Sequence, residues 1–333
     1  MRTRIFDTTQ SDVRQAADLL SCGALIAFPT ETVYGLGADA LNPEAVAAVY
    51  DAKGRPSDNP MIVHIADPDD LRKLTDDVTD DMRKLMDAFW PGPLTLVVPK
   101  RPVVPYRTTG GLETVAVRMP DSETALELIR TAGCPVAAPS ANLSGKPSPT
   151  RAEDVIRDMD GRIEGIIAGE PCRIGIESTV LDMTGKVPTI LRPGMITAEQ
   201  LEQVLGRTVE YDKALYARSD EAEDFKPKSP GMKYKHYAPE ADMVILSGER
   251  SRVEAEIEKR RAEKEAAGVR TGVILFGEDG YEEAAHDLFA KLRELDRDGV
   301  ELIIAGALGT DDQRGFAVMN RMLKSAGYNV IEV

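Results

Sequence analysis

Short apolar runs alternate with amphipathic segments along residues 1–205. The apolar runs are bounded by Gly, Pro or polar residues, which predicts strands. The segments with apolar residues every three or four positions predict helices. Ser11 and Asn42 are the expected N-caps of the first two helices. The predicted strands are 24–29, 61–65, 95–98, 115–118, 136–138, 165–168 and 179–181, and the predicted helices are 11–20, 42–52, 80–89 and 123–131.

The pattern changes after residue 205. Residues 206–240 are charged and have no apolar periodicity, so they are predicted to be a linker. The end of this linker, SPGMKYKHYAP, is unusually basic and aromatic, and its Lys233, Lys235 and His236 could meet an anion. Strands and helices then alternate regularly from residue 241. The predicted strands there are 242–246, 272–276, 301–305 and 328–332, and the predicted helices are 251–266, 281–296 and 314–326.

These patterns predict an α/β protein with two domains. Residues 1–205 should form a twisted mixed sheet with helices, and residues 241–333 a small Rossmann-like parallel α/β domain. The formal net charge of -15 disfavours broad binding to nucleic acid or anionic lipid. The three cysteines are far apart, as in a reducing cytosol, and no apolar run approaches a membrane span. The N-terminus lacks the apolar core of a signal peptide, so we expect a cytoplasmic protein.

Two polar clusters in the first domain are candidate sites. PTETVYGLG at 29–37 follows a predicted strand, where hydroxyl groups and glycines commonly line a ligand crevice; a hydrogen-bonded turn is the alternative. Lys53 and Arg55 flank a glycine, which suits a polyanion, although both could instead lie on a solvated helix C-terminus. Asn59 precedes a proline that forces an extended exit, so its side chain could face the same ligand.

Further candidates lie near later strands. Thr114 and Arg118 flank an apolar strand; Arg118 could bind a carboxylate or be an ordinary charge at a sheet edge. The loop APSANLSGKPSPT at 139–150 offers hydroxyl and backbone groups to phosphates, but it lacks Walker spacing. Glu177-Ser178-Thr179 precedes a strand, and Leu191-Arg192-Pro193-Gly194 ends the domain. Together these cations and hydroxyl groups predict a site for a ligand with phosphate and carboxylate groups.

The same motifs, in the same order, resemble the two-domain threonylcarbamoyl-AMP synthases, whose catalytic part is a YrdC-like domain. The resemblance rests on PTETVYGLG, the KxR element at 53–55, NPMIVHI, FWPGPLT, the SxN element at 140–142, EST, LRPG and SPGMKYKHYAP. It runs from about residue 11 to residue 240, and the small C-terminal domain also fits. One departure is Lys235, where the family pattern has arginine, which puts only that contact in doubt.

The resemblance implies a nucleotidyltransferase reaction in which L-threonine, bicarbonate or CO2, and ATP give threonylcarbamoyl-adenylate, pyrophosphate and water. Mg2+ would be bound through the phosphates, and a downstream transferase would use the product to modify tRNA. Lys53 and Arg55 are the residues expected to act on the phosphates in catalysis. The L-threonine residues carried over by motif are Thr32, His64, Arg118, Ala138, Ser178 and Thr179. The ATP residues are Lys53, Arg55, Asn59, Thr114, Ser140, Asn142, Ser148, Arg192 and Tyr237, with Tyr237 a lid residue in the linker.

Two other classes share this kind of domain. The first is an RNA-binding module, which the negative charge disfavours as a main role although a weak tRNA contact is compatible with it. The second is a carbamoyl-transfer protein of hydrogenase maturation, which also needs acylphosphatase and zinc-knuckle segments that this sequence lacks. Whether a side chain serves as general base, whether bicarbonate or CO2 is used, what the C-terminal domain does and which oligomer forms stay open.

Overall fold

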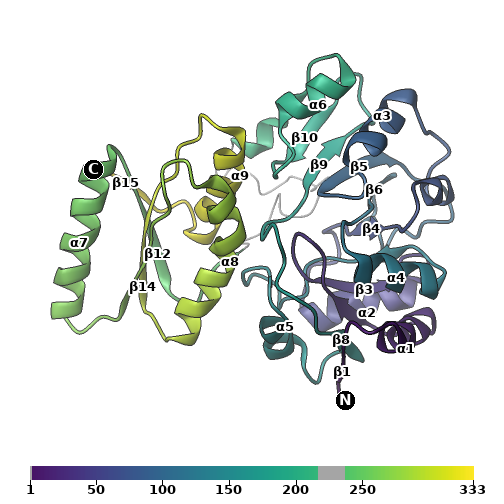
Figure 1. Ribbon diagram of the computed structural model, residues 1–333, viewed down its shortest axis with the longest axis horizontal. Coiled ribbons are helices and arrows are strands. Elements are labelled where there is room, and N and C mark those ends of the chain that lie inside the picture. Colours follow the sequence, from purple (N-terminus) through teal and green to yellow (C-terminus); the bar gives the residue numbers. More distant parts are fainter. Residues whose placement is uncertain (1, 217–236) are drawn as a thin grey trace. The chain divides into compact units, whose positions relative to one another are not determined.

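The computed structural model describes residues 2–216 and 237–333. The chain divides into two compact units. The first contains Met1–Ser144 and Ser148–Lys233, and the second contains Gly145–Pro147 and Tyr234–Val333. Both units are α/β, which confirms the predicted fold class (Figure 1). Among the described residues, no helix combines the length and apolar character needed to cross a membrane.

The first unit is built on an 11-stranded mixed sheet in the order β1-β8-β2-β3-β7-β4-β6-β5-β9-β10-β11. Parallel and antiparallel neighbours alternate irregularly: β4 is parallel to β6 but antiparallel to β7. The strands are β1 (Arg4–Phe6), β2 (Ile26–Phe28), β3 (Gly35–Asp39), β4 (Ile62–His64), β5 (Leu94–Pro99), β6 (Thr114–Arg118), β7 (Val136–Ala137), β8 (Gly165–Ile167), β9 (Thr179–Asp182), β10 (Thr189–Arg192) and β11 (Glu210–Tyr211).

Helices cover this sheet through apolar faces that join one large core. Figure 1 shows α1 beside α4, and these two helices are in contact, as are α3 and α6. The helices are α1 (Gln10–Ser21), α2 (Pro43–Lys53), α3 (Asp80–Phe89), α4 (Glu123–Ala132), α5 (Ala152–Met159) and α6 (Ala198–Leu205), with 3-10 turns at Pro68–Lys73 and Lys213–Leu215. Asn42 caps α2 as predicted, with Pro43 in its first position. The prediction of Ser11 as N-cap is wrong, because Thr9 caps α1 by accepting from the backbone of Asp12.

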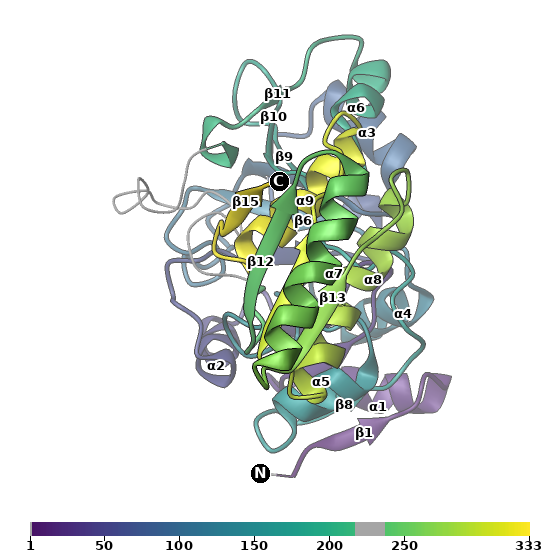
Figure 2. The same cartoon turned by 90° about the vertical axis from the view of Figure 1, so that its left-hand side faces the viewer.

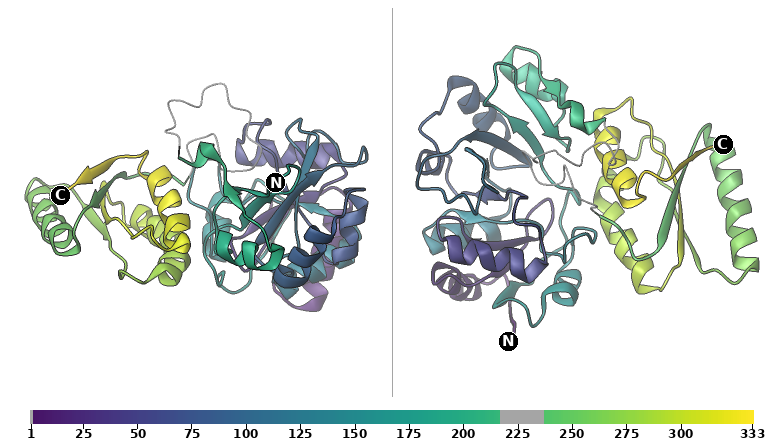
Figure 3. Two further views of the ribbon diagram at one scale, coloured as in Figure 1. Left: turned by 90° about the horizontal axis from the view of Figure 1, so that it is seen from above. Right: turned by 180° about the vertical axis from the view of Figure 1, so that it is seen from behind.

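The second unit is a four-stranded parallel sheet in the order β13-β14-β12-β15. Its elements are β12 (Asp242–Ser247), α7 (Arg250–Ala266), β13 (Thr271–Ile274), α8 (Tyr281–Arg297), β14 (Leu302–Gly306), α9 (Gln313–Ser325) and β15 (Val330–Glu332). Helix α7 crosses one face of this sheet, as Figure 2 shows, while α8 and α9 cover the other face (Figure 3). This arrangement confirms the predicted small Rossmann-like domain.

Regular structure extends into the segment that the sequence predicts as a linker. Strand β11 lies within 206–240 and pairs in parallel with β10. It continues the first unit's sheet past residue 205. Lys233, Lys235 and His236 lie outside the residues that the structure describes.

Candidate active site

Lys53 and Arg55 lie at the end of α2 and are both buried, with 3% and 9% of their surface exposed. Gly54 adopts a left-handed conformation between them, with a φ of 62°, and so ends the helix. The Lys53 ammonium donates to the backbone carbonyls of Ser140 and Asn142, the latter at 2.5 Å. These two cations are therefore not on a solvated helix end, and Lys53 joins α2 to the loop that carries the SxN element.

The Arg55 side chain contacts the backbone of the loop that follows it, at residues 59–60. Its guanidinium donates to the carbonyl of Pro60 at 3.0 Å and to that of Asn59 at 3.4 Å. Asn59 is 2% exposed, and its side-chain oxygen has no hydrogen-bond partner among the described residues. A buried polar atom without a partner is uncommon in folded proteins, so this oxygen faces a place suited to a ligand donor.

Arg118 ends β6, which lies between β4 and β5 and so is an inner strand. Its guanidinium donates to the carboxylate of Glu31 at 2.6 Å and to the carbonyl of Gly92 at 3.2 Å. Both partners of the ion pair are buried, with 4% and 1% of their side chains exposed. Arg118 is thus not a charge at a sheet edge. Sequence reasoning did not single out Glu31, although it belongs to the PTET cluster.

His64 ends β4, and its Cα is paired with that of Arg118 across the two parallel strands. Burial, together with the nearby positive charge of Arg118, lowers the pKa of His64 to about 3. The imidazole is therefore neutral throughout the physiological range. Its ring lies edge-on to Phe28 at a centroid distance of 6.3 Å.

Thr30 and Thr32 form the hydrogen-bonded turn that was the alternative interpretation of the PTET cluster. The Thr30 hydroxyl donates to the carbonyl of Val33 at 2.6 Å and lies 2.9 Å from the Thr32 hydroxyl, which is the expected hydrogen-bonded turn. Glu31, between them, takes no part in this turn through its side chain, which reaches Arg118 instead. The turn holds the residue that enters the ion pair.

Ser178 and Thr179 lie at the start of β9, close to the end of β10. The Ser178 hydroxyl is 2.7 Å from the Thr95 hydroxyl, and Arg192 donates to the Ser178 carbonyl at 3.1 Å and to its hydroxyl at 3.2 Å. Thr179 donates to the carbonyl of Ile196 at 2.7 Å. These contacts bring EST and LRPG together.

The loop after β7 carries four of the sequence-predicted residues. Ala138 donates its backbone N–H to Ile62 at 2.9 Å, and Ser140 pairs with Gly35 in an isolated bridge. Asn142 is buried, and Ser148 is buried with its hydroxyl donating to Glu177 at 2.6 Å. Hydrogen bonds therefore connect this loop to α2, β3, β4 and the EST segment.

Two predicted residues lie outside these contacts. Thr114 begins β6, at the opposite end of the strand from Arg118. Tyr237 belongs to the second unit, where it is buried and its ring stacks on Phe289 at a centroid distance of 5.0 Å. The remaining predicted residues lie in the first unit and, together with Glu31, are called the network below.

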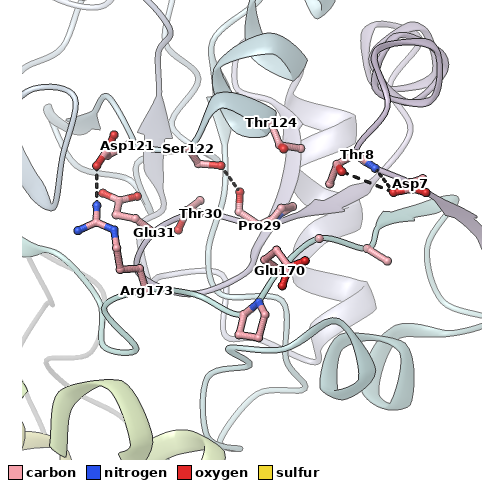
Figure 4. A pocket seen from close by; sticks show the side chains of 13 residues that line it. Asp7, Thr8, Pro29, Thr30, Glu31, Asp121, Ser122, Thr124, Glu170 and Arg173 are labelled. Atoms are coloured by element: carbon pink, nitrogen blue, oxygen red, sulfur yellow. Dashed lines mark hydrogen bonds and ion pairs between the residues drawn. The ribbon is translucent and has the colours of Figure 1, made fainter. Parts of the chain in front are cut away.

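A pocket of about 430 Å³ opens beside this network (Figure 4). Thr30, Glu31, Ser122 and Arg173 are among its lining residues, and Arg173 forms an ion pair with Asp121 at 2.5 Å. Pro29, Thr30 and Glu31 belong to the PTET cluster, and the other lining residues were not among the sequence candidates. Glu31 thus belongs both to the lining of this pocket and to the ion pair with Arg118.

Buried cations and hydroxyl groups on a mixed sheet, followed by a parallel α/β unit, define a two-unit α/β enzyme that binds anionic substrates. A family model described as "Telomere recombination" matches residues 18–194, and one described as "Threonylcarbamoyl-AMP synthase, C-terminal domain" matches residues 196–327. A threonylcarbamoyl-AMP synthase of Pyrococcus abyssi is 47% identical over 96% of each chain. One of Bacillus subtilis is 49% identical over 97% of this chain and 95% of its own.

A solved structure of P. abyssi Sua5 complexed with L-threonine is also similar, with a TM-score of 0.94 and 46% identity over 99% of this chain and all of that one. The chain belongs to the threonylcarbamoyl-AMP synthases, a family of nucleotidyltransferases, in their two-domain form. The family assignment and the function predicted from the sequence motifs are thereby confirmed.

Proposed function

We propose that this chain joins L-threonine, bicarbonate or CO2, and ATP into L-threonylcarbamoyl-adenylate, and that a downstream transferase uses the product to modify tRNA. The threonine amine and the one-carbon substrate form a carbamate, with release of water from bicarbonate or of a proton when CO2 is used. A carbamate oxygen then attacks the α-phosphorus, the bond to the β-phosphate oxygen breaks, and pyrophosphate leaves. This chemistry needs alignment and charge neutralisation more than a covalent enzyme intermediate.

The cations of the network would neutralise the nucleotide. Lys53 and Arg55 are proposed to act on the phosphates, supported by their burial next to the loop after β7. Mg2+ would arrive with the phosphates of the nucleotide, which commonly supply its ligands. The remaining proposed ATP residues are Asn59, Thr114, Ser140, Asn142, Ser148, Arg192 and Tyr237.

The threonine site is proposed around Arg118, whose guanidinium would bind the substrate carboxylate. Arg118 keeps one terminal nitrogen beyond those that contact Glu31 and Gly92, so it can hold a second anion. Neutral His64 would line the site without adding charge. Thr32, Ser178, Thr179 and the backbone of Ala138 complete the proposed set.

The lid role of Tyr237 is a proposal supported by the family resemblance. A side chain that closes the site would keep water from the labile adenylate. Tyr237→Ala should then raise the rate at which bound threonylcarbamoyl-adenylate is lost, measured by rapid filtration of enzyme loaded with labelled threonine. Tyr328→Ala, on the α9–β15 turn, is the control. Equal retention in both variants would reject the lid.

The observation that carries the proposed function is the burial of Lys53, Arg55, Arg118 and Arg192 in one unit of a chain whose net charge is -15. A nucleotide and an amino-acid carboxylate carry the negative charges that complement such a concentration of buried cations. We would measure pyrophosphate release with ATP and Mg2+, leaving out threonine or bicarbonate in turn. Release that requires both supports the proposal, and release without threonine contradicts it. The proposal places the enzyme in the cytoplasm, where its substrates are available.

A further inference from the structure

Glu31 and Arg118 form a buried ion pair that joins two distant parts of the chain. The carboxylate oxygen Oε2 of Glu31 lies 2.6 Å from Nη2 of Arg118, across 87 residues of sequence. Arg118 is held from a second side by the carbonyl of Gly92. The pair therefore has a defined geometry and little freedom to rearrange.

The other oxygen of Glu31 has no such partner. Oε1 is buried and makes no hydrogen bond to any of the residues that the structure describes. A buried carboxylate oxygen left unpaired is costly, because it has lost its water without gaining a donor. Glu31 is also one of the residues that line the pocket in Figure 4, although its side chain is 1% exposed.

An α-amino acid carries the two charged groups that would complement Glu31 and Arg118. Its ammonium and carboxylate are attached to one carbon, so the two groups that bind them must be adjacent and of opposite charge. Arg118 and Glu31 meet that requirement, and neutral His64 beside them leaves the charge balance unchanged. The pair matches a zwitterion better than it matches an anion alone.

We propose that Oε1 of Glu31 accepts a hydrogen bond from the α-ammonium of the amino acid whose carboxylate Arg118 binds. This inference rests on the proposed function, since it assumes that Arg118 holds the threonine carboxylate. It makes Glu31 a specificity-determining residue, which selects free α-amino acids over carboxylates that lack the amine.

The test compares two ligands, L-threonine and (R)-3-hydroxybutanoate, which keeps the carboxylate, hydroxyl and methyl groups but lacks the amine. Their affinities for the full chain are measured in the presence of ATP by ligand-observed NMR. The wild type should bind threonine about 10- to 100-fold more tightly than the analogue, the range expected for a hydrogen bond to a charged group. Glu31→Gln should weaken threonine by a similar factor and leave the analogue nearly unchanged.

A role limited to orienting Arg118 would give a different result. Glu31→Gln would then weaken both ligands by the same factor, and this outcome overturns the inference but not the proposed function. Absence of threonine binding in the wild type overturns the proposed function and the inference with it. Glu170→Gln is the matched control, because Glu170 lines the same pocket but is exposed.

Glu31→Asp is the second variant to measure, and it tests the same hydrogen bond if Glu31→Gln fails to fold. It retains the charge but shortens the side chain by one methylene group, which withdraws the carboxylate from the amine. The preference for threonine over the analogue should fall several-fold. An unchanged preference in this variant overturns the inference.

Discussion

Lys53 shows how a single buried cation can join two segments. Its ammonium donates to the carbonyls of Ser140 and Asn142, and the residue is 3% exposed. Lys53→Ala would leave both buried carbonyls without this donor and should lower the free energy of unfolding by about 2–5 kcal/mol. Urea denaturation of both proteins measures the change. Lys84→Ala on the exposed face of α3 should stay within about 0.5 kcal/mol, and a similar small effect at Lys53 would contradict the prediction.

His64 should make the protein acid-sensitive. Its folded-state pKa of about 3 lies below the ordinary histidine pKa of 6.5, so below pH 6.5 the unfolded chain binds a proton that the folded chain does not. Stability attributable to His64 is therefore present above pH 6.5 and is lost as the pH falls toward 3. Between pH 7.5 and pH 5.0 the loss should be about 2 kcal/mol.

The measurement is urea denaturation at those two pH values. Other groups contribute to the acid effect, so the wild type is compared with His64→Gln, whose loss on acidification should be smaller by that amount. His286→Gln, in α8 with a side chain 45% exposed, should behave like the wild type. Equal pH dependence in all three proteins would show that His64 is not buried in its neutral form.

Single residues were predictable from the sequence only where a motif carried them. Lys53, Arg55 and Arg118 stood out because cations next to glycine or at strand ends have few roles in an acidic chain. The sequence could not show whether Lys53 was solvated or buried, because its burial depends on contacts with the loop after β7. The pairing of Glu31 with Arg118 was also hidden, because no local pattern relates residues 87 positions apart.

At the scale of elements, close backbone approach at Gly110 holds the loop that carries Asn59. A Cβ at Gly110 would lie 2.7 Å from the carbonyl oxygen of Asp58 and 3.1 Å from the nitrogen of Pro60, and its φ is 61°. Gly110→Ala should therefore displace the 58–60 backbone, destabilise the chain by more than the 1–2 kcal/mol of left-handed strain, and raise the KM for ATP.

Gly133→Ala is the matched control for this prediction. Gly133 has a φ of 73° at the end of α4, and nothing lies within 4 Å of its added Cβ. It should show the backbone strain alone, with an unchanged KM for ATP. Urea denaturation and steady-state kinetics of the two variants separate strain from crowding, and equal effects on both measurements would rule out a role for the close approach.

The elements that the sequence predicted are those with strong local signals. Helix α3 was predicted with its observed bounds, because an amphipathic segment ends there at Pro91-Gly92-Pro93. Strands β1, β3, β10 and β11 and helices α5 and α6 were missed. Strand β1 is three residues long and pairs with β8 far along the chain. Helix α5 has no side-chain cap and buries Asp154 and Asp158, so its buried face does not look apolar.

The mixed sheet also changes how the site is built. In an open parallel sheet, the carboxyl ends of all strands meet at one crevice. Here β4 and β7 are antiparallel, so His64 and the loop that follows β7 leave their strands at opposite ends. The site is assembled instead by long side chains and specific contacts, such as Arg118 to Glu31 and Lys53 to Asn142. For this reason the site could be predicted only in part from the residues at strand ends.

At the scale of the whole molecule, net charge separates a synthase from an RNA-binding module. Phosphate backbones bind proteins through released counterions, which needs clustered positive charge, whereas this chain has a net charge of -15 and its candidate-site cations are buried. We expect unmodified tRNA to bind with a dissociation constant no tighter than about 10 μM at physiological salt. Pyrophosphate release should be unaffected by its addition.

Fluorescence anisotropy of labelled tRNA between 50 and 300 mM salt measures this binding. A basic RNA-binding domain of similar size is the positive control, and any weak contact of this chain should disappear as salt rises, because only exposed charges take part. Binding that is submicromolar at physiological salt, or tRNA that is needed for pyrophosphate release, would contradict the prediction. Either result would mean that RNA is recognised through a locally basic surface despite the acidic net charge.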